Sequence, residues 1–273
     1  MNIGLTGSSG VLGTKLKKML KLKKKNFFLG KIENSNHVNN WIKSNSFDHI
    51  IHLAAIVPTK TVNKNKNKSM KVNYEGTKNL VDAINNYSKK KIWFFYSSTS
   101  HVYGPKKTII SELSKKSPIS YYGFTKLKGE KYIIKNQKKI KICIGRIFSF
   151  TSKNQTKKFI IPKIITNLKR NKKKIYFKNL NHNRDFLSIE EISLAIINLL
   201  NKNSKGIFNI CSGKKINLID ILKTLNKKYK KNIFIVNDKN KVATTLYGSN
   251  KKLINLGWRP NKSSYLDYLY KNY

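Results

Sequence analysis

Gly7-Ser8-Ser9-Gly10-Val11-Leu12-Gly13 follows the short apolar stretch Asn2-Ile3-Gly4-Leu5-Thr6 at the start of the chain. After this turn, apolar residues recur with the spacing of one helix face, at Val11, Leu12, Leu16, Met19 and Leu20. The sequence therefore predicts a strand, a glycine-rich turn and a helix in immediate succession. The backbone N–H groups of such a turn and helix start can cradle the pyrophosphate of a dinucleotide.

Three glycines give this motif its form. We expect Gly7 to permit the tight turn, Gly10 to let the backbone approach a phosphate, and Gly13 to let the helix pack closely on the strand. Val11 and Leu12 would add the first N–H groups of the helix. Taken alone, the motif also fits a glycine-rich turn that binds nothing, but its place between a strand and a helix favours a dinucleotide.

Two kinds of apolar segment alternate along the rest of the chain. Short runs with strand character lie at residues 26–29, 49–53, 92–96, 140–144 and 206–210, and helical patterns lie at residues 38–44, 72–87, 122–135 and 189–200. The run at 92–96 is apolar throughout, as in a parallel strand that is covered on both faces. This alternation predicts an α/β protein with a doubly wound parallel sheet.

The charge of the chain is strongly unbalanced. Its 273 residues include 57 lysines and arginines but 12 acidic residues, for a formal net charge of +45. A nucleic-acid partner is one explanation. However, only four of the 57 are arginines, and 34 asparagines with five alanines indicate a drift toward AT-rich codons. Because a dedicated nucleic-acid site would also use the forked guanidinium group, we do not expect nucleic acid as a partner.

Several classes of protein are disfavoured. No apolar run in the chain approaches the ~18–20 residues of a membrane span. We expect no signal peptide, because Asn2 to Thr6 lack the charged start and the longer apolar core that one needs. Cys143 and Cys211 are the only cysteines, which excludes a disulfide framework and a cysteine-rich metal site. We therefore expect a cytoplasmic protein that contacts no membrane and binds no metal.

Four further motifs follow the glycine-rich turn in order. They are His52-Leu53-Ala54-Ala55, Val72-Asn73 with Gly76-Thr77 and Asn79-Leu80, Ser97-Ser98-Thr99-Ser100-His101-Val102-Tyr103-Gly104, and Tyr122-Gly123-Phe124-Thr125-Lys126. Together with the glycine-rich turn and Asn183-Arg184-Asp185-Phe186, they resemble the extended short-chain dehydrogenase/reductase family, in its NAD-dependent epimerase/dehydratase group. The resemblance covers nearly the whole chain.

This resemblance implies a Rossmann fold with a small C-terminal substrate-binding lobe. We expect residues 1–150 to form the dinucleotide-binding domain and residues 185–212 to return to it. Residues 151–184 and 213–273 would then form the lobe.

The resemblance also assigns catalytic roles to Thr99, Tyr122 and Lys126. Tyr122 and Lys126 are four residues apart, so a helix brings them to one face. A phenol has a pKa of ~10. A nearby ammonium would help Tyr122 exchange a proton with a sugar oxygen, and Thr99 would hold that oxygen by a hydrogen bond. The alternative is a packed aromatic residue beside a solvated lysine, since lysine is abundant in this chain.

The cofactor implied by the family is NAD or NADP. Its expected contacts are Gly7, Gly10, Val11, Leu12, Gly13, Leu53, Ala54, Ala55, Asn73, Ser97, Tyr122 and Lys126. Many NAD enzymes carry an acidic residue after the second strand, where it binds the adenosine ribose. This chain has Phe27-Phe28-Leu29-Gly30-Lys31 there instead. A lysine can meet a 2′-phosphate, so the segment favours NADP.

The substrate implied by the family is a nucleotide sugar. Arg184 corresponds to the arginine with which relatives bind the diphosphate, a role that suits its bidentate guanidinium group. A salt bridge to Asp185 is the alternative. Ser149 stands where the family often has an asparagine that contacts the substrate. The dehydratases of the family have an Asp-Glu pair where this chain has Ser100 and His101, so we do not expect 4,6-dehydration and expect His101 to be structural.

We therefore expect an enzyme that transfers hydride at the 4-position of a nucleotide-activated hexose, as a 4-ketoreductase or a 4-epimerase. The sequence does not separate these two activities. By analogy with relatives, we also expect a homodimer. The rival predictions are a nucleic-acid-binding protein that uses the lysine-rich surface of the same scaffold, and an inactive cofactor sensor. Neither rival requires Thr99, Tyr122 and Lys126 together.

Overall fold

The computed structural model describes residues 1–57, 59–169, 174–178, 180–229, 234–238, 242–261 and 264–272. Five parallel strands form its main sheet in the order β1-β2-β3-β4-β9. They are β1 (Ile3–Thr6), β2 (His49–His52), β3 (Ile92–Thr99), β4 (Ile140–Ile147) and β9 (Gly206–Ile210). The α/β fold with a parallel sheet that the sequence predicts is therefore confirmed.

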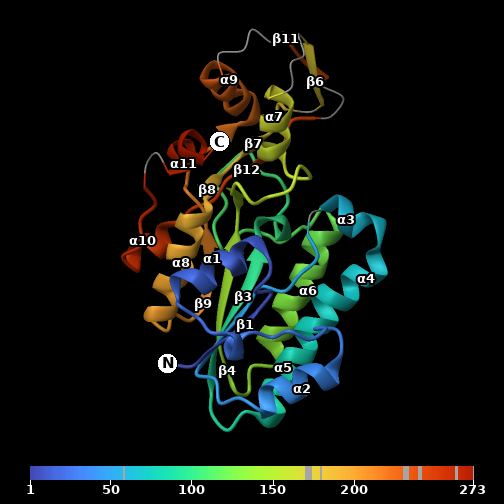
Figure 1. The fold of residues 1–273 in the computed structure, drawn as a ribbon, viewed down its shortest axis with the longest axis vertical. Coiled ribbons are helices and arrows are strands. Elements are labelled where there is room, and N and C mark those ends of the chain that lie inside the picture. Colours follow the sequence, from blue (N-terminus) through green and yellow to red (C-terminus); the bar gives the residue numbers. More distant parts are fainter. Residues whose placement is uncertain are drawn as a thin grey trace.

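Helices cover both faces of this sheet (Figure 1). One face carries α1 (Val11–Met19) and α8 (Ile189–Asn201), and the other carries α2 (Ser35–Lys43), α5 (Gly76–Tyr87) and α6 (Tyr121–Lys135). Successive side chains of β3 point to opposite faces, so Trp93 packs in one hydrophobic cluster and Phe94 in the other. Burial on both sides explains why this strand is apolar throughout.

Residues 26–29 do not form the expected strand. A short helical turn, η1 (Lys24–Asn26), includes the first of them, and their pairing with β1 is a single parallel bridge between Leu5 and Phe27. The Phe28 side chain packs into the core beside α2. The chain then turns away at Gly30, where a Cβ atom would lie 2.9 Å from the Cβ of His37. Phe27 and Phe28 therefore serve packing more than strand pairing, and Leu29 is exposed.

The predicted helix at residues 72–87 begins differently from the expectation. The helices α3 (Thr59–Lys64) and α4 (Lys66–Met70) lead into a π-helical turn, η2 (Lys71–Glu75), which then continues into α5. Asn73 lies within this turn and is fully buried. Such single π turns are frequent at functional sites.

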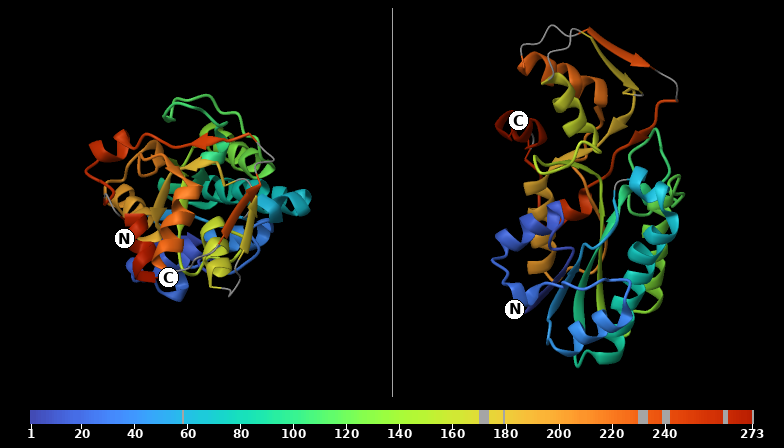
Figure 2. Two further views of the ribbon diagram at one scale, coloured as in Figure 1. Left: turned by 90° about the horizontal axis from the view of Figure 1, so that it is seen from above. Right: turned by 45° about the vertical axis from the view of Figure 1, so that its right-hand side comes forward.

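A second layer of structure lies beyond the carboxyl ends of the main strands (Figure 2). Its helices are α7 (Ile160–Leu168), α9 (Leu218–Lys228) and α11 (Ser264–Asn272), and α10 (Lys251–Asn255) packs beside β9. Its strands pair as β5 (Ser149–Thr151) with β8 (Phe186–Ser188), β6 (Lys174–Lys178) with β11 (Phe234–Asp238), and β10 (Ile216–Asn217) with β7 (Asn183–Arg184) and β12 (Thr245–Leu246). A hydrophobic cluster of its own includes Ile164, Leu222 and Leu269.

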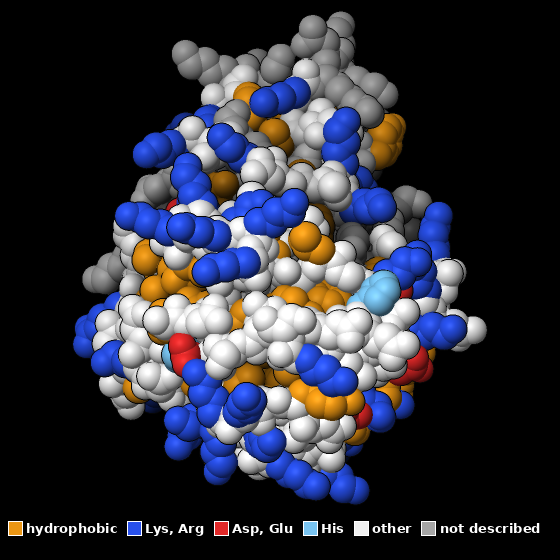
Figure 3. All heavy atoms as spheres, turned by 60° about the horizontal axis from the view of Figure 1, so that its bottom comes forward, with side chains coloured by type: hydrophobic (Ala, Val, Ile, Leu, Met, Phe, Trp, Pro, Cys, Tyr) orange, Lys and Arg blue, Asp and Glu red, His pale blue; other side chains and the backbone are white. Residues whose placement is uncertain are grey.

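The basic side chains are spread over the surface. Figure 3 shows lysines and arginines around one face of the molecule, with uncharged and apolar surface between them and few acidic side chains. No helix in the described part of the chain is long and apolar enough to cross a membrane.

Candidate functional site

The glycine-rich turn joins β1 to α1 and lies against the end of β2. Gly7 has a φ of +72°, and a Cβ atom on it would lie 2.7 Å from the backbone nitrogen of Ala54. A Cβ atom on Gly13 would lie 2.1 Å from the carbonyl oxygen of Gly7. Both positions therefore require glycine, the first for its conformation and the second for close packing. Gly10 is exposed, and its nearest obstacle is the Gly7 carbonyl oxygen at 3.3 Å.

The first turn of α1 has no side-chain cap. The N-cap is Gly10, the helix begins at Val11, and no side chain accepts a hydrogen bond there. The backbone N–H groups at Val11, Leu12 and Gly13 therefore remain available, and the helix dipole favours an anion beside them. This is the geometry that the glycine spacing predicts for a pyrophosphate.

A buried chain of hydrogen bonds connects the turn to α5. Thr77 Oγ1 donates to the carbonyl oxygen of Asn73 (2.8 Å) and lies 3.0 Å from His52 Nε2, while His52 Nδ1 lies 2.6 Å from Thr6 Oγ1. The N–H of Ala54 donates to Thr6 Oγ1 (3.2 Å). These donors are all satisfied when the ring hydrogen is on Nε2. Burial first, and then the charge of Lys126, lower the pKa of His52 to about 3, so the ring is neutral.

The predicted cofactor residues after β2 lie beside this chain. Leu53, Ala54 and Ala55 are half-buried where β2 ends, next to Gly7. Asn73 accepts a hydrogen bond from the N–H of Ile56 (2.7 Å) and donates to the Ile56 carbonyl oxygen (3.2 Å) and to Thr125 Oγ1 (3.2 Å). Both of its amide hydrogens are used, so Asn73 holds the segment after Ala55 against α6.

Thr99 and Tyr122 meet where β3 ends and α6 begins. Ser120 caps α6 by accepting the N–H of Gly123 (3.1 Å). Thr99 Oγ1 accepts the N–H of His101 (3.3 Å) and faces the Tyr122 hydroxyl group. Burial raises the pKa of Tyr122 to about 12, and the neighbouring Thr99 hydroxyl group partly opposes this shift.

Lys126 is buried one turn further along α6, with 1% of its surface exposed. Its Nζ lies 4.0 Å from the centroid of the Tyr96 ring. Burial lowers the pKa of Lys126 to about 7, and the carboxylate of Glu130 acts in the opposite direction. The alternative of a solvated lysine beside a packed tyrosine is therefore wrong.

His101 lies against Tyr122, and the charge of Arg184 acts on His101. The His101 ring meets the Tyr122 ring edge-on, with centroids 5.9 Å apart, and His101 Nδ1 lies 3.3 Å from Ser120 Oγ. Burial, and then the charge of Arg184, lower the pKa of His101 to about 4. Arg184 is therefore close enough to influence this end of the site.

Arg184 does not form the alternative salt bridge with Asp185. Its Nη1 donates to the carbonyl oxygens of Asn183 (2.7 Å) and Thr244 (2.9 Å), and its Nη2 donates to Thr244 Oγ1 (3.0 Å). The Asp185 carboxylate instead accepts hydrogen bonds from Ser212, Gly213 and Gly248. Within the described residues, no carboxylate forms an ion pair with Arg184. Burial lowers the pKa of this guanidinium group to about 10.

Two more predicted residues flank the ends of the strands. Ser97 is half-buried in β3, where it pairs with Gly145 of β4. Ser149 is half-buried at the start of β5, where it pairs with Phe186 of β8. The structure therefore places both serines where the main sheet meets the second layer.

A family model described as GDP-mannose 4,6 dehydratase matches residues 10–270. The chain belongs to this family of extended short-chain dehydrogenases/reductases. A GDP-6-deoxy-D-talose 4-dehydrogenase of Aggregatibacter actinomycetemcomitans is 28% identical over 82% of this chain and 79% of the relative. An uncharacterized UDP-glucose epimerase, YtcB, of Bacillus subtilis is 30% identical over 74% of this chain and 73% of the relative. The structure of RMD from Pseudomonas aeruginosa complexed with NADPH superposes with a TM-score of 0.87 at 20% identity, covering 100% of this chain and 98% of that one.

The family resemblance drawn from the motifs is thereby confirmed, as is the prediction of an enzyme. Proteins of the same fold have been solved in complex with NAD or NADPH. The residues of this dehydrogenase/reductase fit such a group. The uncapped first turn of α1 suits a pyrophosphate, and the left-handed Gly7 and tightly packed Gly13 shape the turn before it. Gly7, Gly10 and the helix start would hold the pyrophosphate, and Lys126 would supply a positive charge near the reacting end.

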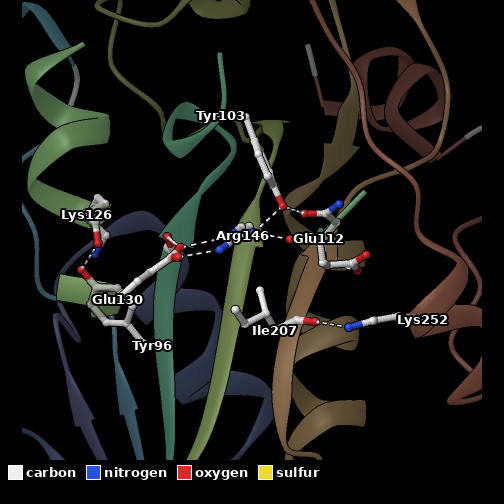
Figure 4. A network of polar contacts seen from close by, with 10 residues as sticks. Tyr96, Tyr103, Glu112, Lys126, Glu130, Arg146, Ile207 and Lys252 are labelled. Atoms are coloured by element: carbon white, nitrogen blue, oxygen red, sulfur yellow. Dashed lines mark hydrogen bonds and ion pairs between the residues drawn. The ribbon is translucent and has the colours of Figure 1, made fainter. Parts of the chain in front are cut away.

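Sequence reasoning missed two charged residues in the core of this family member. The Glu130 carboxylate accepts hydrogen bonds from Arg146 Nε (3.0 Å) and Nη2 (2.7 Å), and both side chains are almost wholly buried (Figure 4). Two signals were present: Glu130 follows Lys126 by one helical turn, and Arg146 is one of four arginines. Local spacing does not predict the contact between them, because it depends on how α6 packs on β4.

Proposed function

We propose that the protein reduces the 4-keto group of a nucleotide-activated hexose with NADPH, by hydride transfer to the sugar carbon. The observation that carries this proposal is that Thr99, at the end of β3, and Tyr122, at the start of α6, lie together, with buried Lys126 one turn further along the same helix. The next residues are Ser100 and His101, so no carboxylate pair follows Thr99 to expel water. The relative described as a GDP-6-deoxy-D-talose 4-dehydrogenase supports chemistry at the 4-position.

Tyr122 acts as the proton donor in this proposal. Because burial raises its pKa to about 12, the phenol is protonated at neutral pH and can donate to the keto oxygen. The Thr99 hydroxyl accepts the N–H of His101, so its own hydrogen can turn toward the keto oxygen when the sugar binds. When bound, the nicotinamide group supplies the hydride. The ammonium of Lys126 stabilises the negative charge that Tyr122 acquires after proton transfer.

Arg184 and the second layer would bind the nucleotide diphosphate. Arg184 has three hydrogen bonds to neutral oxygens and no ion pair among the described residues, so its positive charge is uncompensated. An incoming phosphate would supply the missing negative charge. Ser149 would contact the sugar side from the start of β5.

NADPH oxidation with 4-keto-6-deoxyhexoses linked to GDP, dTDP or UDP tests this proposal. We expect turnover with at least one of these nucleotides, and a loss of kcat by about 1000-fold in Tyr122→Phe. Tyr121→Phe is the matched control, because Tyr121 precedes Tyr122 in the same helical turn, and this variant should keep its turnover. Interconversion of UDP-glucose and UDP-galactose without net NADPH oxidation would show an epimerase instead. Equal turnover in Tyr122→Phe and the wild type would overturn the mechanism.

A further inference from the structure

A continuous polar network crosses the interior of the main sheet next to the candidate site (Figure 4). At one end, Glu130 accepts hydrogen bonds from Ser98 Oγ and from Arg146 Nε and Nη2. Ser98 precedes Thr99 on β3, and Glu130 follows Lys126 on α6. The carboxylate therefore joins the strand that ends in Thr99 to the helix that carries Tyr122 and Lys126.

The far side of the network keeps Arg146 in place. Arg146 Nη1 donates to the Tyr103 hydroxyl oxygen (2.6 Å) and to the Glu112 carbonyl oxygen (3.0 Å). The Tyr103 hydroxyl donates to Asn209 Oδ1 (2.8 Å), and the N–H of Asn209 donates to Glu112 Oε1 (2.9 Å). With these partners on the guanidinium group, Glu130 is held at one position in the core.

Few charged or titratable groups act on Lys126. From β3, the Tyr96 ring lies under its Nζ, and burial, together with the Glu130 charge, keeps the Tyr96 pKa well above its usual value. From β2, His52 is neutral and hydrogen-bonded through both ring nitrogens. On α6 itself, Glu130 is the carboxylate whose charge opposes the effect of burial on Lys126. Tyr122 lies one turn before Lys126 and is protonated at neutral pH.

We propose that Glu130, buried one helical turn after Lys126 on α6, is a positioning residue for Lys126, and that Arg146 holds Glu130 in place for this purpose. This inference rests on the proposed function, in which charged Lys126 assists Tyr122. A buried ion pair is weak evidence for stability, because the desolvation of two charges can exceed their attraction. The Glu130–Arg146 pair instead has a role in the site, because Glu130 lies on α6 with Tyr122 and Lys126 and binds Ser98 of β3, next to Thr99.

Removing the negative charge of Glu130 should make protonation of Lys126 less favourable. Without the Glu130 carboxylate, the negative charge that opposes the effect of burial on Lys126 is lost, and the pKa of Lys126 falls further. A dinucleotide is anionic and binds better to charged Lys126, so NADPH affinity declines as the pH rises through the pKa of Lys126. Removing Glu130 should therefore move this decline to lower pH.

The test measures the dissociation constant of NADPH by fluorescence between pH 5.5 and 9. We expect the midpoint of the pH dependence to fall by about one pH unit in Glu130→Gln, and the dependence to vanish in Lys126→Met. Tyr103→Phe is the matched control, because it removes an Arg146 contact but keeps the Glu130–Arg146 pair. It should lower the melting temperature and leave the midpoint unchanged.

A second variant guards against failure to fold, since a lone buried guanidinium group is strongly destabilising. The pair Glu130→Gln with Arg146→Met leaves no unpaired charge, and its midpoint should also lie below that of the wild type. An unchanged midpoint in a folded variant would show that the ion pair is only structural and would overturn the proposal. Because NADPH binding needs no sugar, this result is separable from turnover. A protein that reduces no keto sugar but shows the shifted midpoint would refute the proposed function alone.

Discussion

The Nδ1 atom of His52 lies 2.6 Å from the Oγ1 atom of Thr6, where β1 passes into the glycine-rich turn. The other ring nitrogen lies 3.0 Å from Thr77 on α5, so one neutral ring joins the turn to the opposite helix layer. The ring cannot be protonated without losing its acceptor role toward Thr6. This arrangement makes the stability of the cofactor turn dependent on pH.

We expect His52 to contribute to acid denaturation. Its pKa is lowered from 6.5 to about 3 in the folded protein, so below pH 6.5 the unfolded chain binds a proton that the folded chain does not. The contribution of neutral His52 to the free energy of unfolding is therefore fully present above pH 6.5. It is lost as the pH falls toward 3, by about 1.4 kcal/mol per pH unit. The free energy of unfolding, measured in urea at several pH values, should depend less steeply on pH in His52→Gln, by this amount. The exposed His37→Gln should retain the wild-type slope, and an equal change in both variants would contradict the prediction.

Two glycines of the turn should respond differently to alanine. A Cβ atom on Gly13 would lie 2.1 Å from the Gly7 carbonyl oxygen, so Gly13→Ala should destabilise the fold by about 1–3 kcal/mol. A Cβ atom on exposed Gly10 would lie 3.3 Å from the Gly7 carbonyl oxygen, a much smaller conflict, but it would face the expected pyrophosphate. Gly10→Ala should keep the melting temperature and lose about tenfold in NADPH affinity, which is about 1.4 kcal/mol. Wild-type affinity in a folded Gly10→Ala variant would place the phosphates elsewhere.

Much of the fold could be predicted from local sequence patterns. The continuous apolar run of β3 reflects burial on both faces, and the glycine spacing reflects close packing between β1 and α1. The strand expected at residues 26–29 did not form, because Phe28 packs on α2, Leu29 is exposed, and only Phe27 forms a bridge with β1. An apolar run reports burial, whereas strand formation also requires a partner along its length.

The parts of the site that depend on local spacing could also be predicted from the sequence, and the long-range contacts could not. The spacing of Tyr122 and Lys126 is local, so their common helix could be read directly, whereas the partners of Arg184 could not. Arg184 binds Thr244, 60 residues away, instead of its neighbour Asp185. Glu130 and Arg146 also meet only through packing of α6 on β4. The catalytic roles of Tyr122 and Lys126 and the binding role of Arg184 stay predictions.

The cofactor preference can be tested at Lys31. This lysine is exposed, and its backbone N–H donates to His37 Nδ1 (3.2 Å), which attaches the segment to the start of α2. If its ammonium meets a 2′-phosphate, Lys31→Asp should weaken NADPH binding by about tenfold and leave NADH binding unchanged or stronger. Lys25→Asp makes the same charge change at another exposed lysine. Equal losses in both variants would indicate general electrostatic attraction by the basic surface.

Arg184 should determine the affinity for the nucleotide sugar. Hydrogen bonds to charged groups contribute about 1.5–3 kcal/mol, so Arg184→Met should raise KM for the nucleotide sugar by about 10- to 100-fold. Arg184→Lys retains the charge but not the planar fork, and we expect an intermediate KM. The dissociation constant of NADPH should stay constant in both variants, because the glycine-rich turn binds the dinucleotide. Since Arg184 also donates to the Asn183 and Thr244 carbonyl oxygens, the melting temperature must be measured beside KM. A lower melting temperature with an unchanged KM would assign Arg184 to the structure of the second layer and leave the diphosphate to other basic residues.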